Sequence, residues 1–343
     1  MDIYNEETVQ VLTSVEHIRK RPGMYIGCID RSGILNIFRE ILENSLENKN
    51  WCTVQILINK DSYKIKFDTC WFEPIKIQNL YLHINLIPIG SFSSTQFGFI
   101  VLNALSTSCV FKFQKEELHF SEGNYIKTKN KNRSNFIIEF ILDKRVFSLN
   151  TLPYTNLMNM LQELSFLNPD RKFIVEDKQN NFKSAFHHPK GILEHFFHLT
   201  FEKTLLSSPI TIHTEKNDYK LDIVFAYTND LDKKNKPIYY SYSYVNNNLC
   251  FLGGSHENAF KRGLKSVYKN LNLEHLSNKS IIVVIYLQIP ENEVAFSGAT
   301  RRCLYIPNLE SWIKKSVLDS VSTYFRENLS VLDEIKIPIS SYY

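Results

Sequence analysis

Glu40 and Asn44 are the residues of this chain whose types and spacing best suit catalysis. They stand four positions apart in a stretch with helical periodicity, so both side chains lie on one helix face. A carboxylate can act as a general base toward water, and an amide oxygen is a ligand that Mg²⁺ accepts. The pair therefore predicts a site where water and Mg²⁺ meet a nucleotide phosphate. Glu43, Glu47 and Asn48 are also polar, which leaves a solvated helix face as the alternative.

A second informative string, R-K-R-P-G-M-Y-I-G at residues 19–27, precedes this helix. Pro22-Gly23 favours a turn and Gly27 ends the segment, so we expect a loop. Together with E-I-L-E-N at 40–44, the string resembles the start of the ATPase region of the DNA gyrase B and topoisomerase IV family, which reads R-K-R-P-G-M-Y-I-G and then E-x-x-D-N. The resemblance implies that Glu40 is the general base acting toward the γ-phosphate of ATP and that Asn44 binds Mg²⁺.

The family's D-x-G-x-G-I-P-V motif resembles D-T-C-W-F-E-P-I at residues 68–75. The resemblance assigns the Asp68 carboxylate to the adenine amino group, and Pro74 also fits the motif. Cys70 and Phe72 replace both glycines, which in the family let the backbone approach the ligand. The role of Asp68 therefore stays open. Asp68 either binds the adenine or is simply a polar residue at the end of a strand.

The family's phosphate-cradling lid, G-G-L-H-G-V-G-x-x-V-V-N-A-L-S, resembles F-S-S-T-Q-F-G-F-I-V-L-N-A-L-S at residues 92–106. The half of the segment that forms a helix matches well, whereas the loop half keeps only one of the family's glycines, Gly98. Glycine turns at a helix N-terminus present the backbone N–H groups that bind phosphates. The segment between Pro74 and Gly98 is also much shorter than in the family, so we expect most of the lid to be missing.

Two further departures concern the same pocket. Asn135-Phe136 stands where the family has G-T, so a hydroxyl near the adenine is lost. A-T-R at residues 299–301 stands where the family's second domain has Q-T-K. Arg301 keeps the positive charge that would reach the γ-phosphate, although its geometry differs from that of lysine. Arg302 is adjacent and offers a second cation.

Composition is ordinary for a folded protein of two domains, with 343 residues and a formal net charge of +4. This mild charge does not indicate a dedicated nucleic-acid binder, and direct DNA binding stays open. The six cysteines are scattered, which argues against a zinc site and suits a reducing cytoplasm. The polar N-terminus does not resemble a signal peptide, and no apolar run has the length of a membrane span.

The hydrophobic pattern predicts an alternation of helices and strands. Residues 125–133 carry alternating lysines and arginine, which we interpret as a solvated hairpin tip, with a binding patch as the alternative. Helices are predicted over 8–19, 33–48, 97–106, 156–166, 190–201, 253–270 and 308–328. Strands are predicted over 54–59, 63–68, 109–114, 136–142, 210–213, 221–227, 239–245 and 281–289.

Further matches in family order lie at 164–174, 189–197 and 253–256. The resemblance thus implies an α+β protein with a GHKL (Bergerat-type) two-layer α/β sandwich over 1–202 and a transducer-like α+β domain over 203–343. The family's cleavage core is not expected in this chain. The arm before Thr8, with Ile3 and Tyr4, resembles the segment by which the family's ATPase domains form homodimers.

Three functions remain open on these observations. The first is a stand-alone, divergent homologue with lost or feeble ATP hydrolysis, acting as a binding or regulatory module on a topoisomerase or another protein partner. The second is an active ATPase subunit that works with a separate topoisomerase core. The third is an enzyme whose altered pocket takes another ligand. ATP and Mg²⁺ are the cofactors that the resemblance implies, with weak binding expected from the missing phosphate contacts.

Overall fold

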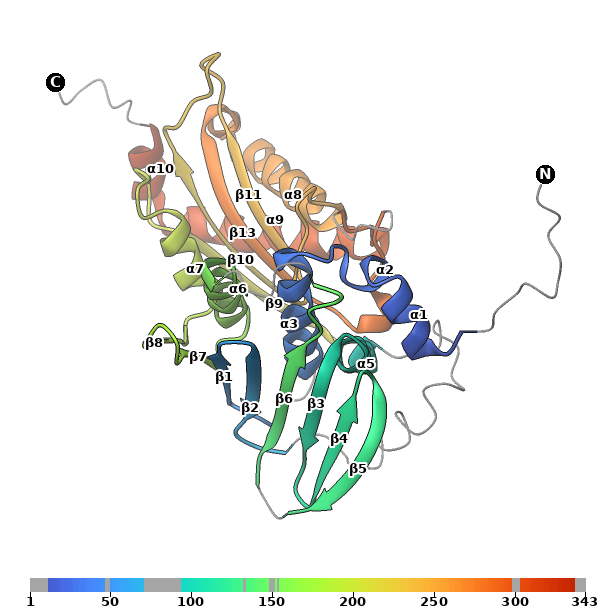
Figure 1. Ribbon diagram of the computed structural model, residues 1–343. Helices are drawn as coiled ribbons and strands as arrows, with labels where there is room; N and C mark the ends of the chain where they lie inside the picture. The colour runs from blue at the N-terminus through green and yellow to red at the C-terminus, as the bar shows by residue number, and fades with distance from the viewer. Residues whose placement is uncertain are drawn as a thin grey trace. The chain divides into compact units, whose positions relative to one another are not determined.

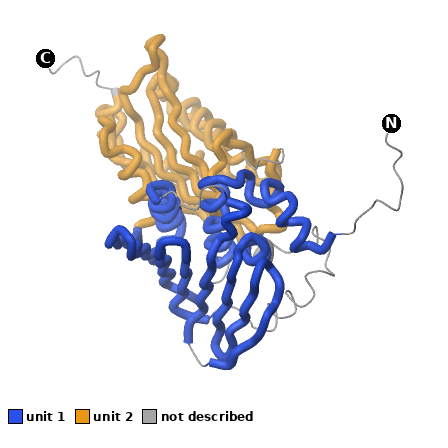
Figure 2. Tube along the Cα trace, viewed as in Figure 1, with its two compact units in different colours: residues 1–188 blue, residues 189–343 orange. Residues whose placement is uncertain are grey.

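The computed structural model describes residues 12–46, 50–70, 94–131, 134–147, 152, 154–297 and 303–336. The chain divides into two compact units, residues 1–188 and 189–343 (Figure 2). Within the described residues, no helix has the length and apolar character needed to cross a membrane.

The first unit is built on an eight-stranded sheet with the order β5-β4-β3-β6-β2-β1-β7-β8 (Figure 1). β1 and β7 are parallel, and the other neighbours are antiparallel. The strands are β1 (Thr53–Asn59), β2 (Ser62–Phe67), β3 (Ser106–Lys112), β4 (Glu116–Ser121), β5 (Asn124–Asn130), β6 (Phe136–Leu142), β7 (Lys172–Asp177) and β8 (Phe182–Phe186).

Helices of the first unit share one hydrophobic core with this sheet. Alternate residues of β1 and β2 are buried, as expected for strands that face helices on one side. The helices are α1 (Ser14–Lys20), α2 (Gly23–Ile26), α3 (Arg31–Leu46), α5 (Ser94–Ala104) and α6 (Tyr154–Leu167). α1 begins at a capping box in which Thr13 and Glu16 bond each other's backbone N–H groups.

The second unit carries a five-stranded sheet with the order β12-β11-β13-β10-β9. Its strands are β9 (Ile210–Lys216), β10 (Tyr219–Thr228), β11 (Tyr239–Val245), β12 (Asn248–Leu249) and β13 (Ser280–Gln288). Its helices are α7 (Ile192–Leu199), α8 (Ser255–Leu271), α9 (Pro307–Glu327) and α10 (Leu329–Lys336), with short 3-10 helices η3 (Glu274–Asn278) and η4 (Glu291–Glu293). α7 contacts β10 and β13, so the division between the units falls before this helix rather than at 202/203.

The predicted helices and strands are present, with shifts of a few residues at their ends, and residues 8–11 and 47–48 of two predicted helices lie outside the described residues. Two predictions were wrong. Residues 19–27 are not all loop, because α2 forms one helical turn before Gly27, whose φ of 80° ends it. Residues 125–133 are not a hairpin tip, because most of them form β5, an edge strand whose seven residues are all exposed.

Candidate functional site

Glu40 and Asn44 lie on α3, at the border of the apolar stripe by which this helix meets the sheet. Ile37 and Ile41 of the stripe are buried, and Asn44 is only 6% exposed. Glu40 is half-buried. The Asn44 amide nitrogen is buried and has no hydrogen-bond partner among the described residues. Since a buried amide without a partner costs free energy, Asn44 is the side chain here that a ligand would satisfy.

Gly98 lies directly against this pair of side chains. It is buried within α5, and a β-carbon built on it would lie 3.1 Å from the Asn44 Nδ2 atom and 3.1 Å from the Glu40 β-carbon. α5 begins at Ser94, so Gly98 stands one turn inside the helix and not in a loop before it. The structure therefore brings Glu40, Asn44 and Gly98 together, and the close approach of α3 and α5 explains the glycine.

Asp68 follows β2 and binds the backbone at the start of β1. The N–H groups of Cys52 and Thr53 donate to its carboxylate at 3.1 and 2.8 Å. The next residue, Thr69, donates its hydroxyl to the Asn50 carbonyl oxygen at 2.6 Å. Asp68 is exposed, and its carboxylate fastens two strand ends. The polar strand end is thus an observed role of Asp68, while adenine binding stays a prediction.

Trp51 connects the end of α3 to the strand that Asp68 binds. Its indole nitrogen donates to the Ser45 carbonyl oxygen at 2.8 Å, and its ring is fully buried against Phe67. Ser45 follows Asn44, and Cys52 follows Trp51. Asn44 and Asp68 therefore stand at the two ends of one short chain of contacts.

Phe136 fills the core next to this site. It is fully buried, stacks on Phe67 at 5.7 Å between ring centroids and on Phe113 at 5.3 Å, and meets Phe99 of α5 edge-on. The family's motif has a threonine hydroxyl at this position. A buried aromatic cluster thus occupies this position, in contact with Phe67, which precedes Asp68, and with Phe99 of α5.

Pro74 and Arg301 lie outside the described residues, as do the predicted arm at residues 1–7 and the segment 71–93. Their assignments to the nucleotide site stay predictions.

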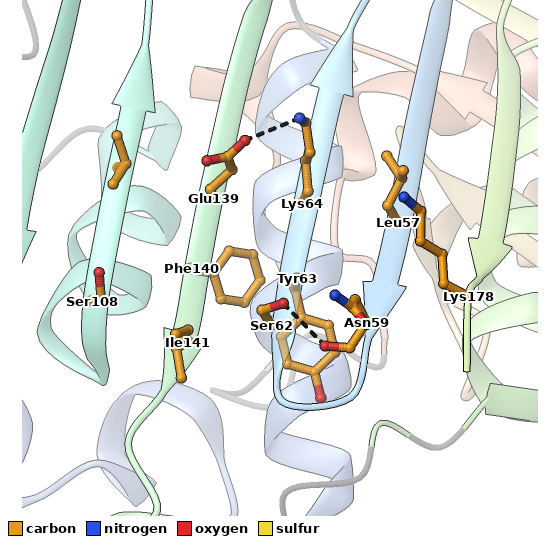
Figure 3. Close-up of a pocket in the computed structure, with 11 residues that line it drawn as sticks. Leu57, Asn59, Ser62, Tyr63, Lys64, Ser108, Glu139, Phe140, Ile141 and Lys178 are labelled. Carbon is orange, nitrogen blue, oxygen red and sulfur yellow. Dashed lines mark hydrogen bonds and ion pairs between the residues drawn. The ribbon is translucent and has the colours of Figure 1, made fainter. Parts of the chain in front are cut away.

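A hollow of about 360 Å³ lies over β1, β2, β3 and β6, and it contains none of the predicted site residues (Figure 3). Glu139 on β6 is paired there with Lys64 at 3.0 Å and with Lys112 at 2.5 Å. Glu139 is the one carboxylate among the lining residues described, and since two lysines already hold it, it does not present a free acid or base here.

Comparisons with known proteins agree with these observations. The family model described as DNA gyrase B matches residues 191–337. The B-subunit of DNA topoisomerase 4 from Mycoplasma capricolum is 25% identical over 377 residues, covering 97% of this chain and 57% of the relative. The B-subunit of DNA gyrase from Clostridium acetobutylicum is 26% identical over 368 residues, covering 95% of this chain and 57% of the relative.

Solved structures share the fold over nearly the whole chain. The B-subunit of the DNA gyrase from Myxococcus xanthus superposes with a TM-score of 0.80 at 18% identity, covering 94% of this chain and 99% of that chain. The 43K ATPase domain of Thermus thermophilus gyrase B, solved in complex with an aminocoumarin, superposes with a TM-score of 0.76 at 20% identity. The match covers 94% of this chain and 93% of that chain. These matches show that the chain is similar to the DNA gyrase B and topoisomerase IV family. It spans little more than half the length of the curated family members that it matches.

The predicted GHKL sandwich followed by a transducer-like α+β domain is therefore confirmed as the gyrase B fold. In this family the R-K-R-P-G string begins the ATPase region, and here its first arginine has a structural contact. Arg19 donates to the Ala104 carbonyl oxygen at the end of α5 at 2.7 Å and pairs with the buried Asp143. The string thus fastens the end of the helix that carries Gly98.

Glu43 is the site residue that the sequence did not reveal, standing where the gyrase B motif has Asp. Its side chain is only 15% exposed and pairs with Arg39 at 3.1 Å. Arg39 also reaches Glu163 of α6 at 3.6 Å. Burial raises the pKa of Glu43 to about 7, Arg39 opposes this shift, and the neighbouring Glu40 and Glu163 carboxylates add to it. A solvated helix face is therefore the wrong interpretation at Glu43.

Proposed function

We propose that this gyrase B-family chain is a binding or regulatory module in which ATP hydrolysis is lost or feeble. The observation that carries the proposal is the carboxylate of Asp68. Two consecutive backbone N–H groups, from Cys52 and Thr53, donate to it. An adenine amino group would have to share this acceptor with a strand contact that the fold already uses.

Changes around the pocket support the same proposal. Phe136 and its stacked neighbours form a buried aromatic cluster where the family offers a hydroxyl. Gly98 is accounted for by the contact between α3 and α5, so its presence does not argue for a phosphate loop. Each charge-assisted hydrogen bond missing from a phosphate site weakens binding by about 1.5–3 kcal/mol. Several such losses leave ATP binding weak or absent.

A second candidate is an active subunit that hydrolyses ATP together with a separate topoisomerase core. Asn44 favours it, since its buried amide nitrogen has no hydrogen-bond partner among the described residues and lies beside Glu40, where it could donate to an acceptor such as a phosphate oxygen. Glu40 would remove a proton from the attacking water, and the Asn44 amide oxygen would hold Mg²⁺. Glu40 and Asn44 could also contact a different ligand, if the altered pocket binds one in place of ATP. ATP and Mg²⁺ thus fit the α3 half of the site better than the Asp68 half.

Calorimetric titration of the full chain with ATP, with and without Mg²⁺, tests the proposal. We expect no binding, or binding in the millimolar range. Micromolar or tighter affinity would overturn it in favour of the active subunit. In that case Glu40→Gln should abolish turnover and keep nucleotide binding, because the base acts on water rather than on the nucleotide. Glu202→Gln, at an exposed position of the second unit, is the control and should turn over as the wild type does.

Homodimerisation through the N-terminal arm is part of the proposal. The arm lies outside the described residues, and its support is the resemblance and the two apolar side chains Ile3 and Tyr4 between charged neighbours. Sedimentation without nucleotide should give a dimer, and deletion of residues 1–7 should give a monomer. A wild-type monomer at all accessible concentrations would contradict this part. A topoisomerase or another protein is the partner that the family suggests.

A further inference from the structure

A second hollow lies in the second unit, between α8, η3 and α9. Its volume is about 500 Å³, which is in the size range of small-molecule sites. Four cationic side chains line it: Arg262, Lys265 and Lys269 from α8, and Lys314 from α9. We call it the α8–α9 hollow. Glu40 and Asn44 belong to the other unit, so this feature plays no part in the site described above.

The charges around the α8–α9 hollow are not balanced. Arg262 is paired with Glu310. For Lys265, Lys269 and Lys314, the described part of the chain offers no carboxylate within ion-pair distance. Glu274 is the one acidic residue that lines the hollow among the residues described. Lys265 and Lys269 stand four residues apart on α8, where like charges oppose each other.

Elsewhere on the same helix a lysine is matched with an acid. Lys261 lies one turn from Glu257 and pairs with it at 2.6 Å. Lys261 is therefore a lysine of α8 whose charge is balanced by an acidic residue on the same helix. The three lysines of the hollow instead concentrate positive potential in a concave place, and such potential attracts multiply charged anions.

One aromatic side chain lines the α8–α9 hollow, and it is nearly buried. Tyr268 lines it, is 6% exposed, and its hydroxyl is bonded to the Tyr227 hydroxyl at 2.7 Å. Burial raises the pKa of Tyr268 above its ordinary value, so the phenol stays neutral. The body of a ligand in the hollow would contact the small exposed part of Tyr268 and the aliphatic stems of the lysines.

We propose that the α8–α9 hollow binds a nucleotide-sized organic anion that carries two or more phosphate groups. The volume of the hollow admits a nucleotide-sized body, and its three lysines select for separated phosphate charges. The proposal goes beyond the function above, since it holds whether or not ATP is hydrolysed in the first unit.

Titration of the full chain with adenosine 3′,5′-bisphosphate tests the proposal, because this probe has a base and two phosphates and no γ-phosphate. We expect millimolar or tighter binding that weakens about tenfold or more in Lys314→Glu, where an attraction becomes a repulsion. Lys315→Glu is the matched control, since Lys315 is the exposed neighbour outside the hollow. It should change the affinity less than about twofold.

Absence of binding, or equal losses in Lys314→Glu and Lys315→Glu, would overturn the proposal. Circular dichroism establishes that each variant is folded, and Lys269→Gln gives a second, milder test with the same expected direction. Duplex DNA of random sequence is the competitor. If DNA binds with the same dependence on Lys314 and the bisphosphate does not bind alone, the hollow belongs to a nucleic-acid surface and the proposal is wrong.

Discussion

Gly98 of α5 lies so close to Asn44 of α3 that a β-carbon on the glycine would come within 3.1 Å of the Asn44 amide nitrogen. The two helices therefore meet at the residues that would carry the chemistry. A larger side chain at Gly98 must push α5 away or displace Asn44 and Glu40.

Gly98→Leu should lower the free energy of unfolding by about 1–3 kcal/mol, because the new side chain overpacks the contact between α3 and α5. Urea denaturation of the purified variant measures this. Gly23→Leu is the control, since nothing lies within 4 Å of a β-carbon there, and it should change stability by less than about 0.5 kcal/mol. Equal stability of both variants would refute the close packing.

Glu43 should make stability depend on pH. Its pKa is raised from 4.5 to about 7 in the folded protein, so the folded state binds the extra proton between these values. The free energy of unfolding should therefore fall as pH rises through this window. Glu43→Gln should remove the dependence and be more stable than the wild type above the window, by about 1–3 kcal/mol.

Urea denaturation at several pH values checks the Glu43 prediction. Glu202→Gln, at an exposed position, is the control and should follow the wild-type curve. An unchanged pH dependence in Glu43→Gln would show that Glu43 is ionised throughout.

Asp143 should be the carboxylate on which the first unit depends most. It is 1% exposed and is held by Arg19 and by Arg145. Hydrogen bonds from Arg145 and Arg19 hold its pKa well below the ordinary range, so its stabilisation is present at neutral pH and is lost in acid. Asp143→Asn should cost about 1–3 kcal/mol, because Arg19 and Arg145 lose their charge-assisted hydrogen bonds to this buried carboxylate.

Asp61→Asn is the matched control for Asp143. Asp61 also pairs with a cation, Lys144 at 2.9 Å, but both side chains are exposed. Exposed pairs contribute about 0–1 kcal/mol, so this variant should be nearly as stable as the wild type. Similar losses in the two variants, measured by urea denaturation, would contradict the role given to Asp143.

Asp68→Ala separates the two roles considered for Asp68. If the carboxylate serves the backbone of Cys52 and Thr53, the variant should lose about 1–3 kcal/mol of stability and respond to ATP as the wild type does. Thermal unfolding with and without ATP measures both effects. Asp218→Ala, in an exposed turn of the second unit, should change neither. A loss of ATP affinity in Asp68→Ala with stability unchanged would favour the adenine role.

Much of the fold could be predicted because the signals are local. The apolar spacing at Ile34, Ile37 and Ile41 gives α3, and alternation with a turn at Lys60 gives the β1–β2 hairpin. β4 could not be predicted in this way, because Glu116 and Glu117 open it with charges. Glu117 is nonetheless only 8% exposed, and β4 is paired with β3 on one side and β5 on the other.

The site could be predicted only in part. The spacing of Glu40 and Asn44 places them on one face of α3, as the structure has them. The sequence predicts that Glu43 is solvated. Its burial and its link through Arg39 to Glu163 could not be foreseen, because they depend on α6, far along the chain. Gly98 aligns with a loop glycine, but the helix begins before it, so its use is in packing.

The exposed strand β5 has a consequence for the protein at high concentration. It ends the eight-stranded sheet, and Lys127 and Lys129 stand on it. An outer strand with unpaired backbone groups is a template on which other polypeptides can add, and closely spaced ammonium groups discourage that addition by repulsion. During synthesis and purification, we therefore expect these lysines to oppose the strand-by-strand association of neighbouring copies into insoluble material.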